Sequence, residues 1–168
     1  MQKYIPLKKK SQYDADIHKQ YRNSACGPVT AYTMLDYFLP NQFPNVNELY
    51  KKLGGTPIGL FTHRFIRNLS KLLGSDWLVE KCFIEEMKKQ IDQGRPVAAK
   101  FDKWFTGHWR GRYSYDYHWV AVVGYEVKED ATWLFVHDHG GKNRPSQLQK
   151  LPYEPNADIL TFVKVEPL

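Results

Sequence analysis

The sequence has few cysteines and no long apolar run, and each shortage excludes a class of protein. Cys26 and Cys82 are its only two cysteines, too few for a disulfide scaffold or for a zinc site made of cysteines alone. No apolar run approaches the ~20 residues that a membrane-spanning helix needs. The basic residues are scattered, without zinc-finger spacing or RNA-binding aromatic motifs, so we expect no nucleic acid as a partner.

The start of the sequence also lacks the apolar segment of a secretory signal. Its first twelve residues are polar and include three consecutive lysines, with no apolar segment of the kind that secretory signals carry. This absence favours a cytoplasmic protein. A chain that begins after a removed signal would look the same, and such a protein would be exported.

Length and composition are those of an ordinary globular protein. At ~150 residues per domain, we expect residues 1–168 to form a single domain. Hydrophobic residues make up 42% and charged residues 25% of the chain, which argues against disorder. The formal charge of +6 is modest and fits a solvated basic surface.

Helical periodicity dominates the first half of the chain and strand-like runs dominate the second. The predicted helices are residues 26–38, 46–53, 62–73 and 83–93. The predicted strands are residues 3–7, 77–81, 96–101, 118–126, 131–138 and 158–165. This order predicts an α+β fold with a helical half and an antiparallel-sheet half. A long aromatic segment, residues 102–117, separates two of the strands, and a loop of that length is usually functional.

Cys26 is the first candidate for chemistry, because it begins the predicted helix 26–38. The helix dipole and the unpaired N–H groups there favour a thiolate. The following Gly27 leaves room for another chain to approach the sulfur. A buried, inert thiol is the common alternative for a free cysteine. Cys82 also precedes a predicted helix but has no glutamine upstream, and we interpret it as structural.

A reactive thiol needs a base, and the strands supply one. His118 opens the predicted strand 118–126, and Asp138 ends the next strand, 131–138. In an antiparallel hairpin, the start of one strand lies beside the end of the next. We therefore expect Asp138 to hold one ring nitrogen of His118 and to leave the other for Cys26.

An oxyanion hole needs a second donor besides the backbone N–H of Cys26. Gln20 lies six residues before Cys26, and a short turn would return its side-chain amide to the sulfur. Gln12 is fourteen residues away and would need a separately anchored strand. The sequence therefore favours Gln20 as the donor.

A metal site is a rival hypothesis for the end of strand 131–138. His137 and His139 flank Asp138 and would share one face of the strand. Such a site needs a third ligand, with His63 or His108 as the remaining candidates, and nothing in the sequence places either nearby.

Taken together, these pieces resemble a known family, the bacterial papain-like cysteine peptidases related to the domains that process bacteriocins after double-glycine leaders. The matching pieces are residues 20–28, 54–60, 83–97, 118–125 and 136–138. The chain departs from the family pattern at His139, where proline is frequent, and in its long aromatic segment.

The resemblance implies a papain-like fold and the hydrolysis of a peptide or amide bond through an acyl-thioester. It implies Cys26 as nucleophile, His118 as base, Asp138 as orienting carboxylate and Gln20 in the oxyanion hole. The partner implied is a peptide, protein or cell-wall peptide, and no metal or organic cofactor is required. An acyltransferase on the same fold and a non-catalytic peptide-binding module are the alternatives, and the oligomeric state stays open.

Overall fold

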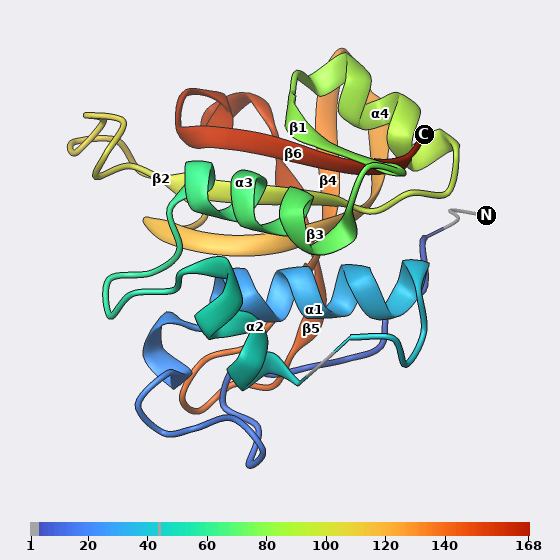
Figure 1. Ribbon diagram of the computed structural model, residues 1–168. Coiled ribbons are helices and arrows are strands. Elements are labelled where there is room, and N and C mark those ends of the chain that lie inside the picture. Colours follow the sequence, from blue (N-terminus) through green and yellow to red (C-terminus); the bar gives the residue numbers. More distant parts are fainter. Residues whose placement is uncertain (1–3, 44) are drawn as a thin grey trace.

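A six-stranded antiparallel sheet is the centre of the fold (Figure 1), in a computed structural model that describes residues 4–43 and 45–168. Its strands are β1 (Trp77–Cys82), β2 (Val97–Asp102), β3 (Tyr117–Lys128), β4 (Ala131–Asp138), β5 (Gln147–Pro152) and β6 (Leu160–Pro167). Their spatial order is β1-β6-β2-β3-β4-β5. The α+β fold predicted from the order of helices and strands is confirmed.

The described helices agree with the periodicity of the sequence. They are α1 (Cys26–Phe38), α2 (Val46–Leu53), α3 (Thr62–Leu73) and α4 (Ile84–Asp92), with short 3-10 helices η1 (Arg22–Ser24) and η2 (Glu154–Ile159). The side chain of Asn45 accepts the backbone N–H of Glu48 and so caps α2, which Gly54 ends in the left-handed conformation. None of the described helices is long and apolar enough to cross a bilayer.

The strands are apolar on both faces because helices cover both. Side chains that alternate along a strand point to opposite faces. On β2 and β3, Ala98 and Trp119 pack with α1, α2 and α3, whereas Ala99 and Val120 pack with residues of α4. The sheet therefore separates the layer of α1, α2 and α3 from α4 and η2.

Two strand predictions need correction. The segment predicted as a strand at 3–7 forms none over its described residues 4–7, although the N–H of Ile5 donates to the carbonyl of Val123 at 2.9 Å. Residue 3 lies outside the described residues. Conversely, β5 was not predicted, because an exposed edge strand carries little of the apolar alternation that marks a strand.

Candidate active site

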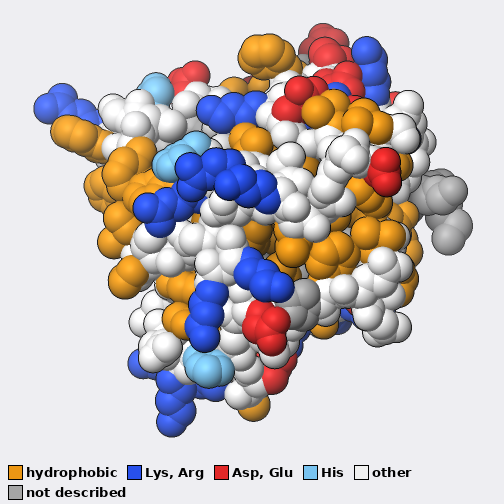
Figure 2. All heavy atoms as spheres, viewed as in Figure 1, with side chains coloured by type: hydrophobic (Ala, Val, Ile, Leu, Met, Phe, Trp, Pro, Cys, Tyr) orange, Lys and Arg blue, Asp and Glu red, His pale blue; other side chains and the backbone are white. Residues whose placement is uncertain are grey.

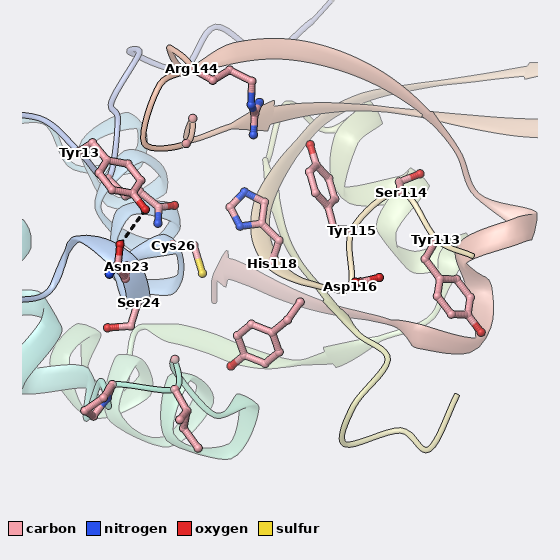
Figure 3. A pocket seen from close by; sticks show the side chains of 17 residues that line it. Tyr13, Asn23, Ser24, Cys26, Tyr113, Ser114, Tyr115, Asp116, His118 and Arg144 are labelled. Carbon is pink, nitrogen blue, oxygen red and sulfur yellow. Dashed lines mark hydrogen bonds between the residues drawn. The ribbon is translucent and has the colours of Figure 1, made fainter. Parts of the chain in front are cut away.

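A cavity of about 590 Å³ opens where the start of α1 faces the start of β3 (Figure 3). Its walls come from the N-terminal segment, the connection between α2 and α3, the segment before β3 and the loop after β4. The lining residues are Gln12, Tyr13, Asn23, Ser24, Cys26, Pro57, Ile58, Gly59, Tyr113, Ser114, Tyr115, Asp116, Tyr117, His118, Gly140, Gly141 and Arg144. Two of the predicted site residues, Cys26 and His118, are among them.

The thiol of Cys26 lies at the first residue of α1, as its position in the sequence predicted. The residue is only 4% exposed, yet its sulfur faces the cavity (Figure 3). Gly27 also has a packing role that was not predicted: a Cβ there would lie 2.8 Å from the Cβ of Leu60. The glycine therefore lets the α2–α3 connection pack against α1.

His118 bridges the sulfur and Asp138. Its Nε2 lies 3.2 Å from Oδ1 of Asp138, which leaves Nδ1 as the ring nitrogen available to the sulfur of Cys26. Burial opposes a charge on the ring, but the hydrogen bonds to Asp138 and Cys26 outweigh it and raise the pKa of His118 to about 9.

The pKa of the Cys26 thiol is shifted in the direction opposite to that of His118. Burial alone would raise the pKa of Cys26, but the hydrogen bond and charge of His118 outweigh it. Hydrogen bonds from the backbone N–H groups of Trp119 and Gly27 act in the same sense, so the pKa of the thiol falls below its ordinary value. A thiol with a lowered pKa beside an imidazole with a raised pKa favours a thiolate–imidazolium pair at neutral pH.

Asp138 has no exposed surface and is surrounded by donors. Besides His118, they are the backbone N–H of Gly140 at 2.9 Å, the hydroxyl of Tyr115 at 2.7 Å, the guanidinium of Arg144 at 2.6 Å and the amide of Gln149 at 3.0 Å. Burial would raise the pKa of the carboxyl, but these partners hold it well below its usual range. The carboxylate is therefore ionised and fixed in place before any substrate arrives.

The three side chains besides His118 that donate to Asp138 were not predicted, and the sequence gives only weak indications of them. Tyr115 belongs to the aromatic segment and stands three residues before His118, and its ring lies 4.8 Å from that of His118. Arg144 follows the Gly140-Gly141 turn, and Gln149 lies on β5 beside β4. Only the pairing of β5 with β4, which was missed, brings that amide to the carboxylate.

The structure does not bring Gln20 to the sulfur. Gln20 is exposed in the turn before η1 and does not line the cavity. Gln12 lines it instead, 6% exposed, with its Nε2 donating to the carbonyl of Arg22 at 2.8 Å. Because Gln12 is distant from Cys26 along the chain, its segment has to be held in place separately. Its backbone N–H does this by donating to the carbonyl of His139 at 3.1 Å.

The metal hypothesis gains no support. Within the described ranges, no group of three or more His, Cys, Asp or Glu side chains is arranged to hold a metal ion. His63 and His108 are both exposed, whereas His137 and His139 are buried. His139 instead lies with Nε2 at 2.8 Å from Oγ1 of Thr30 on α1, so it joins the sheet to the helical layer.

Cys82 lies at the end of β1, away from this cavity. Burial raises the pKa of its thiol to about 12; the charge of Lys164 opposes this shift, and those of Glu80, Glu86 and Glu166 add to it. A thiol with that pKa is almost entirely protonated at neutral pH and is a poor nucleophile.

Comparisons with known proteins identify the fold and the family of the chain. The fold is that of the papain-like cysteine peptidases: it matches the crystal structure of the peptidase domain of Streptococcus ComA, described as a bi-functional ABC transporter involved in a quorum sensing pathway. The match has a TM-score of 0.59 at 11% identity and covers 100% of both chains, so it concerns the fold. The chain belongs to the Peptidase_C39 like family, whose profile it matches over residues 5–160. No curated protein matches it in a sequence search.

Proposed function

We propose that the protein hydrolyses a peptide or amide bond through an acyl-thioester on Cys26. The observation that carries this proposal is the position of His118, in contact with both the Cys26 sulfur and the Asp138 carboxylate. Membership of a peptidase family makes a peptide the expected substrate.

The first step uses the ion pair. The thiolate of Cys26 attacks the carbonyl carbon, and a carbon–sulfur bond forms as the carbonyl electrons move onto oxygen. When the tetrahedral intermediate collapses, the carbon–nitrogen bond breaks, and the imidazolium of His118 gives its proton to the leaving amine. Asp138 keeps the ring oriented and stabilises its charge throughout.

Negative charge on the carbonyl oxygen needs donors. The backbone N–H of Cys26 lies in the first turn of α1, where N–H groups have no partner within the helix. Gln12 supplies the second donor in this proposal, in place of Gln20. Its amide has two N–H bonds, of which the carbonyl of Arg22 takes one, so the other is free to meet the oxyanion.

Deacylation reverses the roles. Neutral His118 takes a proton from water, and the hydroxide attacks the thioester carbon. The carbon–sulfur bond then breaks, the product leaves as a carboxylic acid, and the thiolate of Cys26 and the imidazolium of His118 are restored.

The test is mass spectrometry of a peptide library and of cell-wall fragments incubated with the protein. Cleavage is expected with the wild type and with Cys82→Ala, and none with Cys26→Ala. Cleavage by Cys26→Ala would refute the proposal, as would intact substrates together with an unreactive Cys26. Added amines distinguish the acyltransferase alternative, because an acyltransferase would convert the thioester to a new amide faster than to an acid.

A further inference from the structure

The loop between β2 and β3 carries an exposed aromatic surface that the proposed reaction does not use. This aromatic loop, residues 103–116, projects from the body of the protein at the left of Figure 1, in yellow. Trp104 is 50% exposed, Phe105 64% and Trp109 66%. Large side chains of this kind, gathered at a projection, mark a surface of interaction.

The same loop is basic. It contains Lys103, Arg110 and Arg112, against one acidic residue, Asp116, which pairs with Lys103 at 2.8 Å. Arg110 and Arg112 are exposed, and neither has a hydrogen bond or an ion pair with any residue that the structure describes. Hydrophobic side chains and Lys or Arg side chains lie next to one another on this side of the molecule (Figure 2).

The loop is also held in shape before it meets a partner. At its base, Oδ1 of the buried Asp102 accepts the backbone N–H groups of Trp104 and Phe105, at 3.1 and 2.9 Å. The indole N–H of Trp109 donates to the carbonyl of Trp104 at 2.7 Å, and the ring of Phe105 lies 5.7 Å from that of Phe61. The aromatic side chains are thus presented in advance, which lowers the entropic cost of binding.

We propose that the aromatic loop binds the surface of an anionic lipid bilayer. Trp and Phe at a convex projection can enter the fluid interface of a bilayer, where Trp is favoured, without a preformed pocket in the partner. The free guanidinium groups of Arg110 and Arg112 match the negative surface, and each basic residue near such a surface contributes roughly fivefold to binding. An apolar groove would have pointed to a peptide, whereas this surface is convex and positively charged.

Binding of this kind would set the cavity beside the lipid. Tyr113, Ser114, Tyr115 and Asp116 belong to the aromatic loop and also line the cavity. Ile58, which also lines the cavity, is 63% exposed. A docked loop therefore holds the mouth of the cavity at the bilayer surface, whether or not the proposed hydrolysis occurs.

The experiment is cosedimentation with vesicles of phosphatidylcholine alone or mixed with phosphatidylglycerol. We expect the wild type to bind the mixed vesicles, less strongly as salt rises. Replacing Trp104, Phe105 and Trp109 together by Ser, or Arg110 and Arg112 together by Glu, should weaken binding at least roughly tenfold. The matched controls change exposed residues elsewhere: Phe83→Ser, which is 88% exposed, and Lys19→Glu with Lys128→Glu. Both controls should bind as the wild type does.

Three results would overturn the proposal: no binding of the mixed vesicles, equal binding of the neutral ones, or binding that neither loop variant weakens. A dimer in solution that the triple Ser variant dissociates would assign the loop to a second copy of the chain and would also overturn it. Thermal melts and the rate of Cys26 alkylation show whether each variant is folded. Because vesicle binding needs no turnover, Cys26→Ala should bind like the wild type.

Discussion

Replacing Gln12 by alanine tests the oxyanion hole most directly. Gln12 lines the cavity, and one N–H of its amide is donated to the carbonyl of Arg22, so a single N–H is left for the developing oxyanion. Losing such a donor in a buried site typically costs ~3–4 kcal/mol of transition-state stabilisation, a factor of ~10²–10³ in kcat. KM should change little, because the ground-state carbonyl carries less charge.

The fold should tolerate this change. Gln12→Ala removes one hydrogen bond, worth ~1 kcal/mol. It also removes the buried Oε1 of Gln12, which has no hydrogen-bond partner among the described residues, so part of that loss is offset. A domain of ordinary stability, ~5–15 kcal/mol, stays folded after such a loss. The kinetic defect would then report on catalysis alone.

The assay pairs initial rates on a cleaved peptide with iodoacetamide labelling of Cys26. Alkylation forms no oxyanion, so Gln12→Ala should label as fast as the wild type while its kcat falls. Gln20→Ala is the matched control, and its exposed position predicts wild-type kinetics. A crippled Gln20→Ala beside a normal Gln12→Ala would refute the reasoning. A Gln12→Ala variant that alkylates slowly would assign the amide to the thiol instead.

Three further predictions follow from the pKa shifts. His118→Ala should reduce the rate of cleavage ~10²–10⁴-fold or more. It should also slow the alkylation of Cys26 at pH 6 to 7, because the thiol loses the partner that lowers its pKa. Normal turnover would exclude His118 as the base. Iodoacetamide at pH 6 should modify Cys26 before Cys82, whose pKa is raised to about 12, as peptide mapping would show, and the reverse order in the folded protein would contradict the assignment. Burial lowers the pKa of His139 to about 3, so between pH 6.5 and 3 the unfolded chain binds a proton that the folded chain does not. The free energy of unfolding therefore decreases as the pH falls through this range, by on the order of 5 kcal/mol. His139→Gln should flatten the thermal-melt profile over that window, and an unchanged acid slope would show that other groups set it.

The sequence predicted those parts of the site that lie on regular elements. Cys26 was placed because a helix start has a local signature, and His118 was placed beside Asp138 because two antiparallel strands bring their opposite ends together. Chain direction and strand length, which the apolar pattern reveals, bring the two residues to the same end of the hairpin, where their side chains lie 3.2 Å apart.

Gln12 escaped prediction because its position depends on distant residues. The segment before η1 has no period, and its path is set by hydrogen bonds such as those from Gln12 to His139 and from the N–H of His18 to the side chain of Asn47 at 2.8 Å. Separation along the chain, which favoured Gln20, is a poor guide where the backbone is irregular. Gln149 was missed for a related reason, since it entered the site only through an edge strand without a clear apolar pattern.

The place of β6 in the sheet has a consequence for how the protein is made. β6 follows the other five strands in the sequence but lies between β1 and β2, so Val163 faces Lys81 on one side and Ala98 on the other. Until residues 160–167 have left the ribosome, β1 has no neighbour in the sheet and one side of β2 is unpaired. Contacts this distant in sequence form slowly and leave apolar edges open meanwhile. A chain with this topology completes the sheet only after all of β6 has been synthesised.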